Sequence, residues 1–536
     1  YKNQECRYIQ DLTWGTKAVP RALFDEIVDY QFNDITVKGF KDYDTYLKRV
    51  YGDYMQLPPE DQRVSHGIKA WRVMKNKATL LNMISGMVLQ FFTLVSGFIL
   101  PKIILTCFGS EVNGLVSSLN QFLSYITLVE GGITGVIIAN LYKPIVEQDN
   151  NKISSVLVTA DRFYKKIGAL FIGYSVVLSI VYPLYFKTEF KFAYVCSLTL
   201  ILSLTLLIQY MYSLTLRTLL NADKKGYVVN FTQTLIVIFN VLFALISVFI
   251  YPSIHVLKLI SGSLFLLQPL IFNRYVKKNY TIDWKVEPDN SLIKSRWNGF
   301  AINLAAFIHN STDVTVLTFL ANLKTVSIYS VYSLVSSGIK QVIDACLSGI
   351  AHTVGQAYAK KNWKELNQKL DIYEYIVFVL VFFLFTVTAL LITPFVRLYT
   401  RGIVDTEYNQ PLFGFLLVLA EALYLVKLPH LNLAYSANKF KEITVPAYIE
   451  ATLNIVISVA LVKKLGLIGV TIGTIVGMTY RMVFHVYYTS KIVPGRAQRI
   501  FYRKLFLFAV GAGAGFALCY KLLPLQNVTV GSWIVH

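Results

Sequence analysis

Long apolar runs separated by short polar connections dominate the chain from residue 79 onward. A membrane-spanning helix needs about 20 mostly apolar residues, and thirteen stretches meet that requirement. Residues from Val528 onward resemble the start of a fourteenth span. The chain also opens on YKNQECRYIQ without Met. We therefore expect it to be a piece of a longer protein. The predicted spans are roughly 79–105, 113–141, 163–186, 193–219, 227–251, 255–273, 298–320, 326–352, 373–396, 411–436, 445–462, 465–488 and 501–522.

This pattern predicts an all-α polytopic membrane protein with 13 to 14 transmembrane helices. Ile104-Leu105-Thr106 closes the first span and Val316-Leu317-Thr318 closes the seventh, and a Ser-rich helix follows each. Six spans separate the two copies, which indicates two parallel six-helix lobes around a central cavity. We therefore divide the chain into a soluble segment 1–76, an N-terminal lobe 77–275 with spans 1–6, a C-terminal lobe 276–490 with spans 7–12, and a last part 491–536.

Composition separates the soluble start from the membrane body. Charged residues make up 24 of the first 78 positions but only 58 of the remaining 458, and 55% of the chain is apolar. These values exclude a soluble globular enzyme, a disordered protein and a secreted disulfide scaffold. The five cysteines are scattered without a CxxC pair, so no metal or redox site is expected.

The net charge of +20 does not indicate a nucleic-acid partner, because the basic residues sit in short loops between apolar runs. Lysines and arginines concentrate in cytoplasmic connections of polytopic proteins. Alternate loops are basic here, among them those around Lys165, Lys225, Lys278, Lys361 and Arg499. This asymmetry predicts a cytoplasmic N-terminus.

Ionisable residues inside the predicted spans are candidate functional groups, since a charge in the bilayer is costly unless it faces a cavity or a partner. Three cations, Arg217, Arg296 and Lys340, suit the binding of an anionic head group such as a phosphate or pyrophosphate. The alternative for Lys340 is an internal ion pair with Asp344, four residues on in the same span.

Acidic groups in the spans are candidates for ion coupling. Asp313 is the main one, with His309 one helical turn away, and Asp344 and Glu130 are the others. Coupling to H⁺ or Na⁺ is left open, and no other cofactor is expected. The alternative is that Asp313 only hydrogen-bonds nearby residues or a neighbouring helix. Nothing in the chain matches a phosphate-binding loop or a nucleophile elbow, so a transporter is expected rather than an enzyme.

Several segments resemble bacterial polysaccharide flippases of the multidrug/oligosaccharidyl-lipid/polysaccharide superfamily. They include LPKIILTCFGSEVNGLVSSLNQFLSYITLVEGGI (100–133), NSTDVTVLTFLANLKTVSIYSVYSLV (310–335), FVRLYTRGIVDTEYNQPLFG (395–414) and EATLNIVISVALVKKLGLIGVTIGT (450–474). The resemblance covers about 79–522 and is specific for exporters of O-antigen or capsule repeat units.

The resemblance implies a V-shaped, fourteen-helix fold that opens alternately to either side of the bacterial cytoplasmic membrane. The implied cargo is an undecaprenyl-pyrophosphate-linked oligosaccharide, and the implied partners are membrane lipid, a polysaccharide polymerase and glycosyltransferases. Related lipid II flippases bind the pyrophosphate with cavity arginines. Those arginines have no position-by-position match here, so the three cations above are assigned from their place in the spans alone.

The first residues resemble a different family. FKDYDTYLKRVYGDYMQLPPEDQRVSH (40–66) is similar to the carboxyl-terminal end of LicD-type phosphocholine transferases, whose acidic catalytic motif lies upstream of that region and is absent here. Two alternatives to a simple flippase stay open. One is a drug or metabolite cation antiporter of the same fold, and the other is a truncated bifunctional transferase–flippase.

Overall fold

The structure of the chain is a computed structural model that describes residues 8–9, 19–32, 35–56, 77–130, 132–186, 189–289 and 297–522. It divides into two compact units, Tyr1–Lys75 and Asn76–His536.

The first unit contains strands, which the sequence pattern did not predict. β1 (Tyr8–Ile9) pairs with β2 (Val19–Pro20), and β3 (Ile27–Phe32) forms an antiparallel hairpin with β4 (Ile35–Phe40). A short 3₁₀ turn and helix α1 (Tyr43–Tyr51) complete the described part. Asp42 caps α1 by accepting a hydrogen bond from the Thr45 backbone N–H at 3.2 Å.

The second unit is helical, and helix occupies every predicted span from 79 to 522. Polar side chains cap the N-termini of several of these helices, and Asp149 caps α5. Hydrogen bonds from Lys152 to the Asp149 carboxylate hold the pKa of this carboxyl below its ordinary value. The helices are α2 (Lys77–Ser124), α3 (Thr127–Glu130), α4 (Ile133–Glu147), α5 (Asn150–Tyr185), α6 (Phe192–Ile208), α7 (Leu214–Ala222), α8 (Gly226–Ile250), α9 (Ile254–Ser263), α10 (Leu267–Asn279), α12 (Trp297–Leu320), α13 (Leu323–Ala359), α14 (Trp363–Tyr399), α15 (Pro411–Val426), α16 (Leu428–Ser436), α17 (Phe440–Leu465), α18 (Leu467–Ile492) and α19 (Gln498–Leu522).

Within the described residues, ten helical stretches are long and apolar enough to cross a membrane, judged by length and composition. The first of them, Ala78–Glu130, leaves helical geometry at Gly109, where φ is 84°. A positive φ suits glycine, which has no Cβ, so α2 is interrupted here and consists of two helical parts. The prediction of an all-α polytopic membrane protein is confirmed, while the expected fourteenth span lies outside the described residues.

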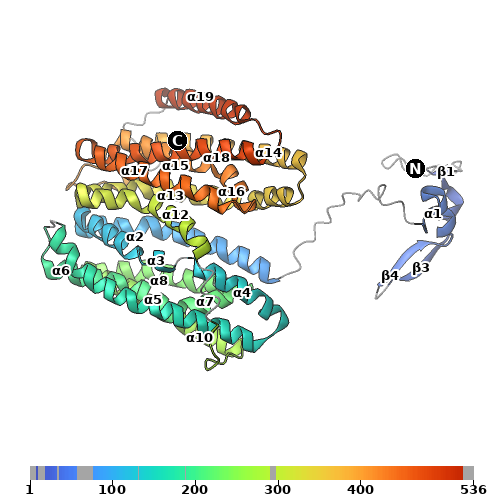
Figure 1. The fold of residues 1–536 in the computed structure, drawn as a ribbon. Helices are drawn as coiled ribbons and strands as arrows, with labels where there is room; N and C mark the ends of the chain where they lie inside the picture. Colours follow the sequence, from blue (N-terminus) through green and yellow to red (C-terminus); the bar gives the residue numbers. More distant parts are fainter. Residues whose placement is uncertain are drawn as a thin grey trace. The chain divides into compact units, whose positions relative to one another are not determined.

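Two separate hydrophobic cores define two lobes. One core draws on α2 to α10 and includes the fully buried Tyr164, Phe171 and Tyr182. The other draws mainly on α12 to α18 and includes Tyr332 and Phe378. The lobes meet where α2 packs on α13, and α19 lies outside the second lobe against α14 (Figure 1).

Helices α17 and α18 approach each other closely through glycine. A Cβ on Gly469 would lie 2.7 Å from the Leu461 carbonyl carbon, and one on Gly477 would lie 3.1 Å from the Glu450 carbonyl oxygen. This contact brings the polar side chains of the two helices together inside the C-terminal lobe.

Candidate functional site

Asp313 lies inside the C-terminal lobe, and only 6% of it is exposed. Tyr329 of α13 donates its hydroxyl to Oδ2 at 2.9 Å. Thr474 of α18 places its Oγ1 3.0 Å from Oδ1 and 3.1 Å from Oδ2. The carboxylate therefore joins three helices, which is the hydrogen bonding to neighbouring helices that the sequence left open as an alternative. A change in its charge would act on the packing of α12, α13 and α18 together.

Lys340 pairs across helices rather than along its own. Its Nζ lies 3.0 Å from Glu421 Oε2 on α15 and 3.7 Å from the centre of the Tyr424 ring. The ion pair with Asp344 that the four-residue spacing suggested is thus replaced by one with Glu421. Asp344 is half-buried and still interacts electrostatically with Lys340. Lys340 is held inside the lobe, with 15% of its side chain exposed.

A second layer of charge lies between α15, α17 and α18. Lys427 is 2% exposed, and its Nζ lies 3.2 Å from Met478 Sδ and 4.5 Å from the Tyr424 ring centre. Glu450 Oε2 forms an ion pair with Arg481 at 2.6 Å, with both side chains buried. Arg481 therefore points into the lobe rather than toward the membrane interface.

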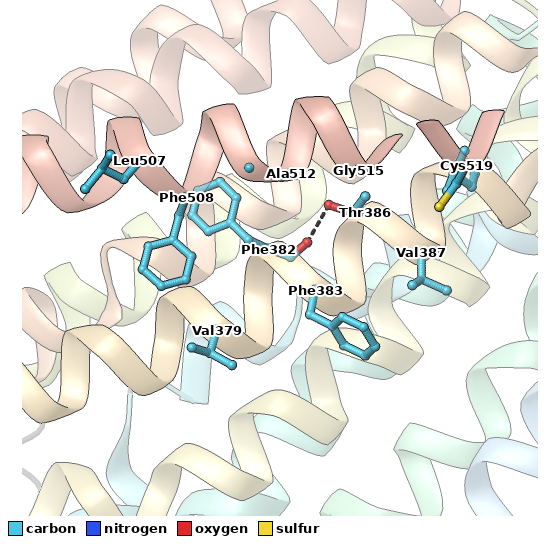
Figure 2. Close-up of a pocket in the computed structure, with 12 residues that line it drawn as sticks. Val379, Phe382, Phe383, Thr386, Val387, Leu507, Phe508, Ala512, Gly515 and Cys519 are labelled. Carbon is cyan, nitrogen blue, oxygen red and sulfur yellow. Dashed lines mark hydrogen bonds between the residues drawn. The ribbon is translucent and has the colours of Figure 1, made fainter. Parts of the chain in front are cut away.

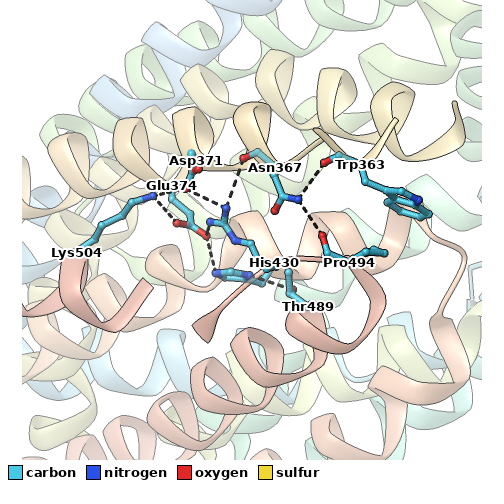
Figure 3. Close-up of polar contacts among 9 residues, drawn as sticks. Trp363, Asn367, Asp371, Glu374, His430, Thr489, Pro494 and Lys504 are labelled. Carbon is cyan, nitrogen blue, oxygen red and sulfur yellow. Dashed lines mark hydrogen bonds and ion pairs between the residues drawn. The ribbon is translucent and has the colours of Figure 1, made fainter. Parts of the chain in front are cut away.

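A third cluster surrounds Glu374, which is 1% exposed (Figure 3). Its carboxylate pairs with Arg496, with Lys504 at 3.0 Å and with His430 at 3.3 Å. Asp371, one turn earlier on α14, also pairs with Lys504, at 2.6 Å. This cluster joins α14, α16 and α19, together with the segment before α19 that carries Arg496.

The N-terminal lobe carries its own polar cluster around Glu130. Thr134 donates to one carboxylate oxygen and lies 2.7 Å from the Tyr164 hydroxyl, while Tyr210 donates to the other oxygen at 3.4 Å. Tyr210 sits in a π-helical turn, Gln209–Ser213, an irregularity often found at functional sites. Arg217 lies close enough for its charge to act on Tyr164 and is half-buried. It forms no ion pair within the described part of the chain.

Hydrogen bonds join the two lobes near the α12–α13 connection. Loop charge predicts that this end of the helices faces outside, and we call it the outer end. Asp405, in the α14–α15 loop, accepts hydrogen bonds from the Ser110 backbone N–H at 2.7 Å and hydroxyl at 2.6 Å. Tyr408 bridges Ser110 and Ser327, each at 2.8 Å. Asn113 donates to Ser327 at 2.8 Å. These bonds hold the outer ends of the lobes together.

An apolar groove of 560 Å³ lies between α14 and α19 and is lined by Val379, Phe382, Phe383, Phe508 and Cys519 among others (Figure 2). Its hydroxyl, on Thr386, is directed to the Phe382 carbonyl oxygen. Because none of its lining residues is charged, the groove is a poor site for an anionic head group.

The predicted site residues therefore separate into two groups. Glu130 and Arg217 lie in the N-terminal lobe, and Asp313, Lys340 and Asp344 in the C-terminal lobe. Arg296 and the side chain of His309 lie outside the described residues.

Sequence reasoning did not assign the partners that complete these clusters, chiefly Tyr329, Glu421, Thr474, Glu374 and Asp405. Glu421 and Glu374 carried a usable signal, since each is an acid within an apolar run. The two hydroxyl residues carried none, because Tyr and Thr are ordinary in membrane helices.

No family model and no curated protein sequence matches the chain. Solved structures do share its fold. Lipid II flippase MurJ in an inward closed conformation aligns with a TM-score of 0.64 at 14% identity, over 85% of this chain and 95% of that one.

Two multidrug transporters also align. The inward-facing conformation of a multidrug resistance MATE family transporter of the MOP superfamily gives a TM-score of 0.56 at 14% identity, covering 78% of this chain and 100% of that one. The MATE multidrug transporter DinF-BH gives a TM-score of 0.57 at 16% identity, covering 78% of this chain and 96% of that one. The membrane unit thus has the two-lobe fold of these flippases and transporters.

Proposed function

We propose that the chain moves an undecaprenyl-pyrophosphate-linked oligosaccharide from the inner to the outer leaflet of a bacterial cytoplasmic membrane. The observation that carries this proposal is the set of cations and carboxylates inside both lobes of a bundle whose outer end is closed by hydrogen bonds. Charged groups inside membrane helices mark substrate and ion pathways. A shared fold with a lipid II flippase supports the same class of cargo.

Arg217 and Lys340 are the cations that would meet the pyrophosphate. Arg217 suits the role because it is half-buried and forms no ion pair within the described part of the chain. Lys340 would have to exchange Glu421 for a phosphate oxygen, which the partial exposure of both side chains permits. Arg296 remains a third candidate from its position in the sequence.

Asp313 is the group that would couple transport to an ion gradient, H⁺ or Na⁺. Its bonds to Tyr329 and Thr474 make the packing of three helices depend on its charge. Asp344 and Glu130 are the other candidates. The polymerase and glycosyltransferases proposed as partners would act on the same lipid-linked unit on either side of the membrane.

The test uses purified protein in proteoliposomes with a fluorescent undecaprenyl-pyrophosphate-linked oligosaccharide. Arg217→Ala and Lys340→Ala should each slow gradient-driven translocation at least 10-fold at equal protein abundance. Lys340→Ala/Glu421→Ala controls for a stranded carboxylate, and normal transport by this double variant would remove Lys340 from the proposal. Asp313→Asn should leave only slow exchange that ignores the gradient.

Cation antiport by the same fold is the second candidate, because the fold is also shared with multidrug transporters. The buried carboxylates Asp313 and Glu450 and the half-buried Glu421 are the groups that would favour a cationic cargo. A rhodamine dye in the same vesicles distinguishes the two, since the flippase proposal expects no protein-dependent dye movement. A transferase role is the other alternative, since residues 40–66 resemble the carboxyl-terminal end of LicD-type transferases.

A further inference from the structure

The apolar groove between α14 and α19 lies on the flank of the C-terminal lobe. α19 packs against α14 on one side (Figure 1), and no residue in its most apolar stretch is buried. Phe383 of α14 and Leu507 of α19 line the groove from its two sides and are 67% and 58% exposed. Large exposed apolar surfaces mark contacts with a membrane or a partner, so the groove is open to the lipid around the protein.

The groove is shaped to hold an extended chain. Gly511, Ala512 and Gly515 form its α19 wall together with Leu507 and Cys519 (Figure 2). A Cβ on Gly511 or Gly515 would have no neighbouring heavy atom within 4 Å, so open space lies beside both residues. At 1.5 Å per residue the wall from Leu507 to Cys519 is about 18 Å long. This length is close to half of the roughly 30 Å hydrocarbon core, which is the depth of one leaflet.

Two arginines extend α19 beyond the inner end of the groove, which loop charge predicts to face the cytoplasm. Arg503 lies one helical turn before Leu507, and Arg499 lies one turn before Arg503. Both arginines are exposed, and neither forms an ion pair within the described part of the chain. A guanidinium group binds phosphate oxygens through two parallel hydrogen bonds. This end of the groove therefore suits a phosphate group.

The neighbouring Lys504 holds this part of α19 against α14. Its Nζ lies 2.6 Å from Asp371 and 3.0 Å from Glu374 (Figure 3). The same two acids also pair with Arg496. Because Lys504 and Arg496 balance the two acids, the two exposed arginines give the inner end of the groove an excess of positive charge.

Tyr375 lies at the same end of the groove on the other helix. It is one turn before Val379, which lines the groove on α14. Its ring lies edge-on to the Phe508 ring, with the ring centres 5.9 Å apart, and 57% of the residue is exposed. Tyrosine suits the boundary between lipid chains and head groups, because its ring is apolar and its hydroxyl can donate to a phosphate.

We propose that the groove between α14 and α19 binds an anionic phospholipid of the inner leaflet. One acyl chain lies along the wall from Leu507 to Cys519, and the phosphate contacts Arg503 and Arg499 beyond the inner end. The groove has no charged lining residue, so it takes the chain and leaves the head group to the arginines. Anionic lipids are concentrated in the cytoplasmic leaflet, and basic sites between membrane helices on that side bind their head groups. This lipid joins α19 to α14 and is not the transported cargo.

The test is photo-cross-linking of the full chain in vesicles that contain phosphatidylglycerol with a diazirine on one acyl chain. Peptide mapping after illumination locates the label, and phosphatidylcholine with the same diazirine is the comparison without net charge. We expect label on residues 379–390 of α14 and 507–519 of α19. Labelling should be at least 10-fold stronger for phosphatidylglycerol, because two arginines favour an anionic head group.

The head-group contact is tested by Arg499→Gln/Arg503→Gln. This variant should reduce phosphatidylglycerol labelling to the phosphatidylcholine level, because glutamine keeps polar atoms but has no charge. Lys521→Gln is the matched control, since Lys521 is a basic residue in the last turn at the opposite end of α19. Its labelling should equal that of the unchanged protein.

The chain contact is tested by Gly511→Leu/Gly515→Leu. The two leucines extend into the open space of the groove and should reduce labelling by both lipids at least 10-fold. Gly513→Leu is the matched control, because Gly513 has the same open space at its Cβ but does not line the groove. Val387→Phe narrows the groove from α14 and is the second variant where the leucine variant does not fold.

Phosphatidylglycerol labelling that falls in both variants and persists in both controls supports the site. Equal labelling by the two lipids would overturn the anionic head group, and strong labelling in Gly511→Leu/Gly515→Leu would overturn the groove as the place of the chain. Displacement of the label by an equal amount of undecaprenyl phosphate would assign the groove to the transported lipid instead. Absence of label from both walls would mean that another part of the chain covers the groove, which also overturns the proposal.

Discussion

Asp405 of one lobe caps the helix that begins at Ser110 of the other, accepting hydrogen bonds from both the backbone N–H and the hydroxyl of that serine. Gly109 makes this possible, because its positive φ turns the chain so that the Ser110 N–H is free to point at the loop. A carboxylate at a helix N-terminus is stabilised by the helix dipole as well as by the hydrogen bond. The bond therefore ties the two lobes together at the end that loop charge predicts to face outside.

Asp405→Ala should shift the protein toward the form that is open at the outer end. Loss of a helix cap costs about 0.5–2 kcal/mol, and a change of one or two kcal/mol is a factor of about 5–30 in population. The distance between spin labels on the outer ends of α2 and α13 measures this shift. Glu407→Ala is the matched control, because Glu407 bonds within its own loop. Equal distance distributions in Asp405→Ala and Glu407→Ala would contradict a latch at Asp405.

Locking the same contact should stop transport. A Ser110→Cys/Asp405→Cys pair, in a background without the exposed Cys107 and Cys346, should cross-link with a short thiol-reactive reagent. Translocation should fall at least 10-fold on cross-linking and return when a reducible linker is cleaved. Transport at the uncross-linked rate in the locked protein would show that the outer ends need not separate.

The Glu450–Arg481 pair should be costly to break on one side. Removing one member of a buried ion pair costs about 3–5 kcal/mol, while replacing both with apolar residues is often neutral. Arg481→Met should therefore lower the thermal unfolding temperature in detergent clearly more than Arg481→Met/Glu450→Leu. An additive loss in the double variant would mean that the two side chains do not depend on each other.

Ion coupling by the C-terminal lobe predicts different results for the buried Asp313 and the half-buried Glu130. Glu130→Gln should reduce translocation by less than threefold and keep its dependence on the ion gradient, because Thr134 can still donate to the amide oxygen and the Tyr210 hydroxyl can accept from the amide N–H. Asp313→Asn should remove that dependence. Paired rate measurements with and without a gradient decide between the lobes, and the reverse result would place coupling at Glu130.

The apolar runs alone were enough to predict the helices, because a membrane helix must satisfy its backbone within itself and be apolar over its length. Because the spans are apolar on all sides, their sequence does not show toward which neighbour each side chain points. Lys340 shows the consequence, since its spacing favoured Asp344 while the fold brings Glu421 closer. Pairs such as Glu374 with Arg496 join residues more than a hundred positions apart and depend on how helices cross.

The hairpins of the first unit were missed for a different reason. Strand alternation over six residues, as in Ile27–Phe32, is weak beside the strong apolar signal of the spans. The loop that carries Asp405 was recognised by resemblance, but its role at the outer end was not, since a helix cap from another lobe leaves no mark in local sequence.

The most direct test of the proposed function is the movement of a defined cargo by the purified protein. Proteoliposomes would hold a fluorescent undecaprenyl-pyrophosphate-linked oligosaccharide, and a membrane-impermeant quencher would report the leaflet in which the fluorophore lies. We expect protein-dependent movement of the lipid-linked sugar that accelerates at least 10-fold with an imposed ion gradient and is absent for a rhodamine dye. Gradient-driven movement of the dye, with the lipid-linked sugar left in its original leaflet, would contradict the account.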